Sequence, residues 1–254
     1  MRTEEKINDR LSLYPTITLA EMKGIRLMNR TDTKYVFSTA TLEDILELAA
    51  GEYRVQQTEG SVCSPYHTVY LDTPDKIMYM AHQNGRKTRE KIRVRTYLSS
   101  SLSFLEVKNK SNKGRTDKRR MIVDDPDNLP ENATEKFLSK YALFMMPQIA
   151  PQLENRFQRI TLVNNAMTER LTIDTDIRFR NLLNGNYISL PNLVVMELKR
   201  DGHADSPILR TLNRLRVKKC GFSKYCIGSA MTDHELKQNR FKTRIHKIER
   251  LTQN

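Results

Sequence analysis

Six charged residues lie at a period of two in neighbouring segments of the chain, KIRVRTY at 91–97 and FLEVKNK at 104–110. They are Lys91, Arg93, Arg95, Glu106, Lys108 and Lys110. A period of two gives a β-strand one apolar and one charged face, so the two segments read as the strands of a hairpin. Arginine and lysine only donate hydrogen bonds and repel one another unless an anion lies between them. A face of this kind is therefore a candidate anion site if it is enclosed.

The same alternation recurs in three further segments, 30–34, 171–180 and 194–200. The charged or polar positions there are Arg30, Asp32, Lys34, Thr172, Asp174, Asp176, Arg178, Arg180, Glu197 and Lys199. An open sheet would turn these side chains towards water. A closed antiparallel barrel would turn them inward around a polar bore and leave the apolar faces to be covered by helices. Both arrangements agree with the pattern, and the barrel makes the bore an anion site.

The elements that would position these residues follow from the same patterns and from turn signals. We expect strands at 53–57, 66–71, 157–164, 171–179 and 193–200, beside the charged segments. Helices are expected at 15–23, 41–50 and 206–218, a helix pair at 131–146, and a basic final helix at 232–251. The predicted fold class is α+β, with a closed eight-stranded antiparallel barrel and flanking helices.

Positive charge is concentrated in one part of the chain. The 254 residues carry 43 Lys+Arg and 30 Asp+Glu, a formal net charge of +13. Segment 86–120 alone holds thirteen basic and three acidic residues. Such a field predicts a polyanionic partner, which could be a phosphate chain, a nucleotide, nucleic acid or an acidic membrane surface.

Length and residue usage narrow the class of protein. A chain of this length suits a single domain, here 1–254 with a core at about 25–230 and the basic helix after it. Three cysteines and five histidines show no metal-site spacing, and no GxxxxGK[ST] loop is present. No apolar run approaches the ~20 residues of a membrane span, and the N-terminus lacks the apolar core of a signal peptide. We expect a soluble, cytoplasmic protein.

Seven blocks, in order along the chain, carry a resemblance to a known family. They are RTDTKY at 30–35, VYLDTPD at 69–75, NGRKTREKIRVRTY at 84–97, FLEVKNK with GRTDKRR within 104–120, FQRITL at 157–162, VVMELKR at 194–200 and FSKYCIGS at 222–229. Together they resemble the polyphosphate-polymerase (VTC) domain, a branch of the CYTH-like triphosphate tunnel metalloenzymes. The resemblance implies an eight-stranded tunnel whose basic lining holds a phosphate chain while acidic residues hold a divalent metal.

The resemblance also implies roles for individual residues. The implied catalytic residues are Lys34, Arg93, Arg95, Lys108, Arg159 and Lys224. The implied phosphate-binding residues are Arg30, Arg86, Arg89, Lys91, Arg115, Lys118, Lys199 and Ser223. Glu197 is the main implied metal ligand, with Glu106, Asp174 and Asp176 as further candidates. The chain departs from the family pattern at two positions, since Asp32 replaces a usual glutamate and Phe157 a usual tyrosine.

The activity implied is polyphosphate synthesis from the γ-phosphate of ATP, with Mn²⁺ or Mg²⁺ as cofactor. Phosphoryl transfer depends chiefly on positioning and charge neutralisation, which arginine, lysine and a metal ion supply. The expected partners are ATP and inorganic polyphosphate, with room for a membrane-bound partner. Two alternatives share the fold: a tripolyphosphatase, and a module that binds polyphosphate or inositol phosphates without turnover. Nucleic-acid binding is a third, which the mixture of basic residues with apolar ones and carboxylates disfavours.

Overall fold

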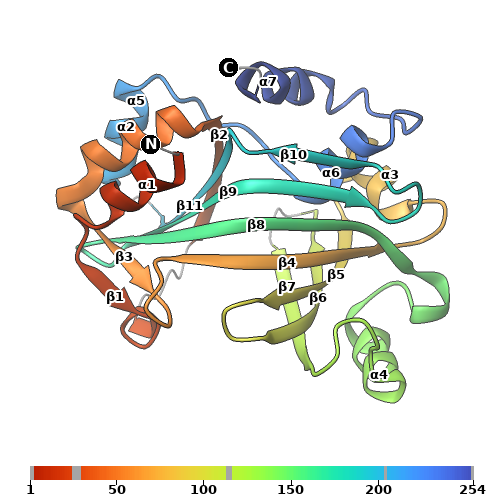
Figure 1. Ribbon diagram of the computed structural model, residues 1–254. Coiled ribbons are helices and arrows are strands. Elements are labelled where there is room, and N and C mark those ends of the chain that lie inside the picture. The colour runs from red at the N-terminus through yellow and green to blue at the C-terminus, as the bar shows by residue number, and fades with distance from the viewer. Residues whose placement is uncertain (1–2, 25–29, 113–115, 203–204, 253–254) are drawn as a thin grey trace.

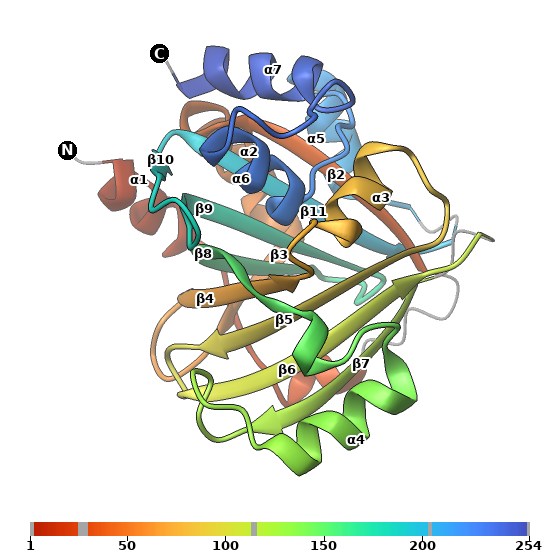
Figure 2. The same ribbon diagram turned by 90° about the vertical axis from the view of Figure 1, so that its right-hand side faces the viewer.

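The computed structural model describes residues 3–24, 30–112, 116–202 and 205–252, and for residues 3, 4, 23, 24 and 30 only the backbone. One strongly curled sheet with helices on its outside makes up the molecule (Figures 1 and 2).

The sheet follows a path of eight strands, each antiparallel to the next. In spatial order they are β2 (Arg30–Ser38), β11 (Leu193–Asp201), β9 (Glu169–Asn181), β8 (Ala150–Asn164), β4 (Cys63–Asp72), β5 (Arg89–Tyr97), β6 (Leu102–Lys110) and β7 (Thr116–Val123). Three short strands extend the sheet: β3 (Tyr53–Gln57) beside β8, β10 (Tyr187–Leu190) beside β9, and β1 (Thr16–Thr18) parallel to β3.

The prediction of an antiparallel sheet flanked by helices is confirmed, but closure of an eight-stranded barrel is not. The sheet has eleven strands, and within the described ranges no ladder joins β2 to β7. The outer edge of β2 has another partner instead. The N–H of Cys220 donates to the carbonyl oxygen of Lys34 over 2.7 Å, and Tyr35 forms an isolated bridge with Lys219. Because this later segment occupies part of the edge, the end strands do not meet as a ladder.

Helices pack against the sheet in separate groups, on its apolar outer face and at one end (Figures 1 and 2). The groups are α1 (Thr3–Leu11), α2 (Thr39–Ala49) and α5 (Pro207–Arg214) over β2, β11 and β9, then α4 (Glu131–Tyr141) over β5–β7, and α3 (Ile77–Gln83), α6 (Lys224–Thr232) and α7 (Lys242–Thr252) at one end. Short 3₁₀ turns lie at Glu21–Gly24, Ala50–Glu52 and Met146–Gln148.

The period of two explains which face each strand buries outside. On β5 and β6, Ile92, Val94, Leu105 and Val107 are buried in one core cluster with Leu138 of α4. Their neighbours in the chain, the basic residues, must therefore point to the inner side of the curl. The predicted helix cover of the apolar faces is confirmed here.

Three helix predictions were wrong in detail. Segment 15–23 forms β1 and a 3₁₀ turn, because the carbonyl of Pro15 accepts from the N–H of Val55 and the segment joins β3. The final helix expected at 232–251 begins ten residues later, as α7 at Lys242, and residues 233–241 form turns and irregular structure. The expected pair at 131–146 is a single helix, α4. Tertiary pairing overrides local propensity at these places.

Candidate active site

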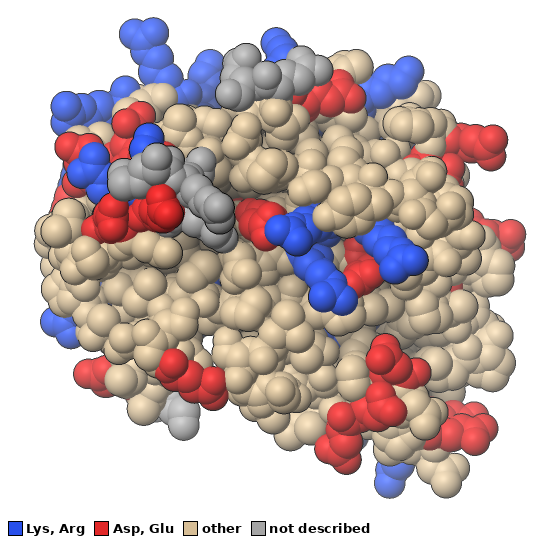
Figure 3. Space-filling view, in the orientation of Figure 1, with Lys and Arg blue, Asp and Glu red and all other residues tan. Residues whose placement is uncertain are grey.

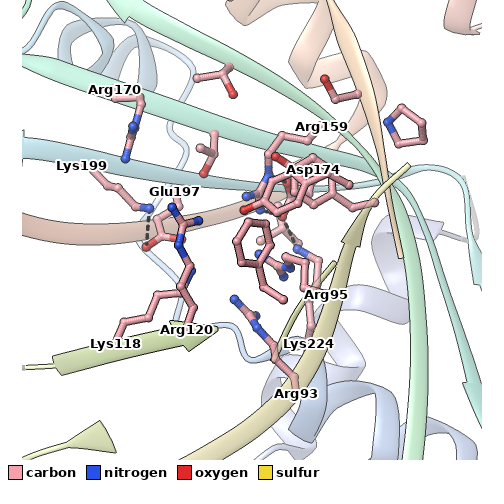
Figure 4. Close-up of a pocket in the computed structure, with 18 of the residues that line it drawn as sticks. Arg93, Arg95, Lys118, Arg120, Arg159, Arg170, Asp174, Glu197, Lys199 and Lys224 are labelled. Atoms are coloured by element: carbon pink, nitrogen blue, oxygen red, sulfur yellow. Dashed lines mark hydrogen bonds and ion pairs between the residues drawn. The ribbon is translucent and has the colours of Figure 1, made fainter. Parts of the chain in front are cut away.

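The curled sheet encloses a cavity of about 930 Å³. All eight strands of the path contribute lining residues, and the charged ones point into a common space (Figure 4). Residues of the β3–β4 and β5–β6 turns, such as Thr58 and Ser99, line one end, while Phe222, Ser223 and Lys224 at the start of α6 line the other. The cavity is lined by eleven Lys and Arg against four Asp and Glu, so its surplus charge is strongly positive.

Asp174 of β9 forms the centre of one ion cluster. Its Oδ1 accepts from Nε of Arg159 over 2.6 Å, and its Oδ2 from Nη2 over 2.8 Å. Nζ of Lys224 also donates to Oδ2. Burial alone would raise the pKa of Asp174, but Arg159 and Lys224 outweigh it and hold the pKa well below the usual range. Both carboxylate oxygens are thus engaged by basic groups.

Glu106 of β6 forms a second cluster beneath the lining. Its side chain is 1% exposed; Oε2 accepts from Nε of Arg93 over 2.7 Å and from Nη2 over 2.6 Å, while Lys118 pairs with Oε1. Burial opposes ionisation, yet Arg93, Arg95 and Lys118 hold the pKa of Glu106 at about 2. Glu106 therefore acts in this geometry as a counter-ion that fixes Arg93 and Lys118.

Glu197 of β11 is held more loosely than the other two carboxylates. Its Oε1 lies 3.9 Å from Nζ of Lys199, and Lys34 donates its own Nζ to the carbonyl of Phe222 over 2.9 Å. Although burial raises it, the pKa of Glu197 is lowered to about 2 by Lys34, Lys199 and Lys108. The carboxylate is ionised and faces the cavity.

Glu197 is the position that best fits a divalent metal. Mg²⁺ and Mn²⁺ take oxygen ligands, and Mg²⁺ often keeps several waters and needs only one or two carboxylates. Asp32 lines the same cavity and is a diagonal neighbour of Glu197 across the β2–β11 pair, at about 7–8 Å. Within the described ranges no three His, Cys, Asp or Glu side chains group closely enough to bind a metal by themselves. Water and phosphate oxygens would have to complete the shell.

Five lysines of the cavity have lowered pKa values, and Lys199 is one of them. Burial is the largest cause for each, and neighbouring basic groups add to it for Lys91, Lys108, Lys118 and Lys224. The pKa is about 8 for the first three and about 7 for Lys224. Lysines in this state gain from a bound anion, because the anion favours their charged form.

An aromatic pair underlies the basic groups near α6. The rings of Tyr66 and Phe157 stack with centroids 5.1 Å apart. Phe157 lies 4.1 Å from Nζ of Lys224, and the guanidinium carbons of Arg159 and Arg95 lie 5.2 and 5.7 Å from its centroid. Phe157 stands where the family usually has tyrosine. Its ring stabilises the three cations by cation–π contact but carries no hydroxyl group.

The start of α6 is fixed by its own cap and by β5. The side chain of Ser223 accepts from the N–H of Cys226 as an N-cap, and Nζ of Lys91 donates to the same hydroxyl over 2.8 Å. The next residue after Lys224, Tyr225, donates to the buried carboxylate of Asp72 over 2.6 Å. Asp72 also accepts from the backbone N–H groups of residues 73, 78 and 79. Helices α3 and α6 are thereby joined behind the cavity.

Most of the predicted site residues meet in this cavity. Those that line it are Lys34, Lys91, Arg93, Arg95, Lys108, Lys118, Arg159, Asp174, Glu197, Lys199, Ser223 and Lys224. Glu106 lies directly behind them, while Arg86 is exposed and Arg89 half-buried outside the lining. Arg30 begins β2 but only its backbone is described, and Arg115 lies outside the described residues.

The expected single charged face of 171–180 does not persist along β9. The register between β8 and β9 shifts between Arg156 and Gln158, and Asp176 has a φ of 47°. A bulge of this kind reverses the alternation. Asp176 and Arg178 consequently pair with each other over 2.9 Å outside the lining, so Asp176 does not share the cavity with Glu197 and Asp174.

Two lining arginines were missed in the sequence. Arg120 and Arg170 face the cavity (Figure 4). Arg120 lies at period two from Lys118 and Arg170 from Thr172, so the alternation could have found both. The guanidinium of Arg120 lies 4.6 Å over the ring of Phe104.

One prediction tests the buried counter-ion. Replacing Glu106 by glutamine should destabilise the fold by about 2–3 kcal/mol, because Arg93 and Lys118 lose their shared charge while Lys118 stays partly screened by water. In the wild type this contribution is present above the unfolded pKa near 4.5 and is lost as the pH falls towards about 2. Urea unfolding at pH 7 and at pH 3 measures both effects. Glu135→Gln on the exposed face of α4 is the control, and equal stability of both variants would contradict the assignment.

Comparison with known proteins places the chain in context. Residues 29–232 match the family model described as VTC domain. No curated protein sequence matches the chain. None of the helices in the described ranges is both long and apolar enough to cross a membrane.

Three solved structures are similar in outline. A protein from Hippeastrum, named for an adenylyl cyclase and described with a dominant triphosphatase activity, shares 11% identity at a TM-score of 0.48 over 81% of this chain and 97% of its own. A protein from Vibrio parahaemolyticus named for an adenylate cyclase shares 12% at 0.44, covering 78% and 96%. The PH1819 protein of Pyrococcus horikoshii OT3 shares 9% at 0.43, covering 79% and 98%. Similarity this low carries no information on activity.

Proposed function

The chain belongs to the VTC domain family, and from this premise we propose that it is a metal-dependent phosphoryl transferase that builds inorganic polyphosphate from the γ-phosphate of ATP. The observation that carries the proposal is the cavity itself. Eleven basic side chains converge there from strands on opposite sides, and only four acidic ones accompany them. An extended chain of phosphates is a ligand that could neutralise so many cations at once.

The cavity offers donors on two sides of such a chain. Arg93, Arg95 and Lys108 come from β5 and β6, while Arg159 and Lys224 face them from β8 and α6. In our proposal these groups bind the phosphates of ATP and of the acceptor chain in line and stabilise the charge that moves during transfer. Glu106 and Asp174 hold the basic groups in fixed positions, so little rearrangement is needed at the moment of reaction.

A divalent cation would be held by Glu197, with Asp32 as the nearest further carboxylate on the neighbouring strand. When bound, the metal would neutralise phosphate oxygens and help to align the two reactants. The protein's own part is to keep Glu197 ionised, which its lowered pKa of about 2 ensures at neutral pH. ATP as substrate fits the cytoplasmic location expected from the sequence.

Incubation of the purified protein with ATP and Mn²⁺ tests the proposal. We expect phosphate polymer longer than any added primer, detected by gel electrophoresis and by its digestion with an exopolyphosphatase. Release of orthophosphate alone would favour the tripolyphosphatase alternative, which uses the same cavity but passes the phosphate to water. Tight binding of tripolyphosphate with no metal-dependent product would favour the binding module. Displacement of tripolyphosphate by duplex DNA at physiological salt would contradict a phosphate-chain site.

Proton uptake gives a further prediction. Phosphate should raise the pKa values of Lys91, Lys108, Lys118 and Lys224 from the range of about 7 to 8, so binding at pH 8 should take up protons and affinity should fall between pH 7 and pH 9. The folding stability of the ligand-free protein should depend on pH in the opposite direction. The lysine pKa values lie below the unfolded value of 10.5, so the free protein should gain stability as the pH rises from about 7 to 10. Calorimetry in buffers of different ionisation enthalpy measures the uptake, and binding without uptake would contradict the prediction.

A further inference from the structure

A second group of basic side chains lies outside the cavity, at the end closed by α6. It consists of Arg89, Arg240 and Arg244 and is called the outer basic cluster below. The guanidinium of Arg240 lies so close to Gly85 that a Cβ there would be 2.7 Å from Nη1, and Arg244 lies against Gly221. Figure 2 shows α3 and the segment leading into α7 on the same side of the sheet, and Nζ of Lys237 donates to Asn84 over 3.3 Å between them.

The pKa of His82 on α3 indicates a positive electrostatic potential in this region. Burial lowers its pKa to about 3, with Lys91, Arg89, Arg244 and Arg240 adding to the shift. The imidazole packs edge-on to Phe241 and its Nδ1 lies 3.1 Å from Sγ of Cys226. Burial and these four neighbouring cations together favour the neutral form of the imidazole.

The outer basic cluster lacks counter-ions, in contrast to other arginines of the surface. Within the described ranges none of its three members forms an ion pair with a carboxylate. Five arginines elsewhere on the surface do form one: Arg10, Arg119, Arg156, Arg178 and Arg210. Figure 3 shows basic and acidic side chains beside one another on one face of the molecule. Cations without a counter-ion repel one another when they lie close together, so an anion from outside the protein would stabilise this cluster.

A row of basic residues connects the cluster with the cavity. Arg95, Arg93 and Lys91 line the cavity at period two along β5, and Arg89 is the next position in the same row. Successive members of such a row lie about 6.6–6.8 Å apart. The hydrogen bond from Lys91 to Ser223 marks the end of the cavity, and Arg89 lies beyond it beside Arg240.

We propose that the outer basic cluster is a second anion site, which binds the part of a linear polyphosphate chain that extends beyond the cavity on the α6 side. The inference rests on the proposed function for the identity of the ligand. The inference goes beyond the proposed function because it assigns this surface to long chains. Tripolyphosphate held in the cavity is too short to reach the outer basic cluster as well. The protein should therefore bind long chains more tightly than tripolyphosphate, and the difference should depend on Arg240 and Arg244.

Binding measurements without turnover test this site. Long-chain polyphosphate and tripolyphosphate are titrated in the absence of ATP into the wild type, the double variant Arg240→Ala/Arg244→Ala, and the control Arg214→Ala/Lys218→Ala, which removes two exposed charges next to α5. We expect the double variant to lose about tenfold in affinity for the long chain. Its affinity for tripolyphosphate should stay within about twofold, and the control should bind both ligands like the wild type. Because the readout is binding, it is independent of whether the protein makes polymer.

Several outcomes would overturn the site. These are an unchanged affinity of the double variant for the long chain, an equal loss for both ligands, and an equal loss in the control. A parallel titration with duplex DNA identifies the source of the anion, and a loss for DNA as large as that for polyphosphate would make the cluster a nucleic-acid contact instead. If the double variant is unstable, the single variant Arg240→Glu repeats the test, since it changes one exposed position. It should weaken long-chain binding more than Arg240→Ala does.

Discussion

Replacing Lys224 by alanine should reduce phosphoryl transfer by at least about 100-fold while leaving the thermal stability of the protein unchanged or higher. The side chain of Lys224 is 10% exposed, and its lowered pKa of about 7 indicates that its charge is costly in the free protein. Asp174 would keep both hydrogen bonds from Arg159 after the change, so its carboxylate would not be left unpaired. The group is therefore expected to serve the ligand more than the fold.

Arg95→Ala should behave in the same way, because Arg95 is 6% exposed, donates to Thr68 and forms no ion pair within the described part of the chain. Its pKa is lowered to about 10 by burial and by Arg93 and Arg159. Turnover of ATP and the melting temperature measure the two effects, with Lys136→Ala on the exposed face of α4 as the matched control. A loss of folding in both variants would make these residues structural.

Glu197→Gln should strongly reduce metal-dependent turnover, and the turnover that remains should reach half of its maximum at a metal concentration about 10–100-fold higher. The same change should leave the metal-free affinity for tripolyphosphate unchanged or stronger, because it removes a negative charge from a site that binds an anion. These opposite directions separate a metal ligand from a phosphate ligand. Activity against Mn²⁺ concentration and calorimetry in the presence of a chelator measure them.

Glu59→Gln is the control for this experiment, since Glu59 lines the same cavity near one end but belongs to an exposed turn. Equal metal dependence in the Glu197 variant and the wild type would contradict the assignment. A Glu197 variant that binds tripolyphosphate more weakly without metal would also contradict it, because Glu197 would then be needed to hold Lys34 and Lys199 in place.

The inner surface of β5 and β6 could be predicted from the sequence because side-chain alternation is a local property of a strand. Arg93, Lys108 and Glu197 lie where a period of two puts them. The reversal at Asp176 was not predictable in this way. A bulge is one extra residue opposite a partner strand, and the partner is set by the whole fold. The same reason applies to the outer edge of β2, which pairs with a segment some 180 residues later in the chain.

The position of α6 could not be predicted from the sequence either. Its apolar residues are typical of any buried helix. The structure shows that it fills one end of the curled sheet, with Cys226 and Ile227 in the same core as Phe157. Segment 222–224 could still be assigned to the site, since the block that contains it resembles the family. Its orientation towards Lys91 and Asp174 follows from packing.

Glycine at position 228 has a consequence for comparing members of this family. A Cβ there would lie 2.4 Å from Cδ1 of Phe179 and 2.8 Å from Leu153, so the helix touches the strands with nothing between. A homologue with even an alanine at this position would have to shift its helix away from the sheet or replace the opposing ring. Four residues earlier, the amine of Lys224 would move with it. The identity of one residue in an alignment can thus indicate whether the lysine at the start of this helix lies at the same depth in another protein.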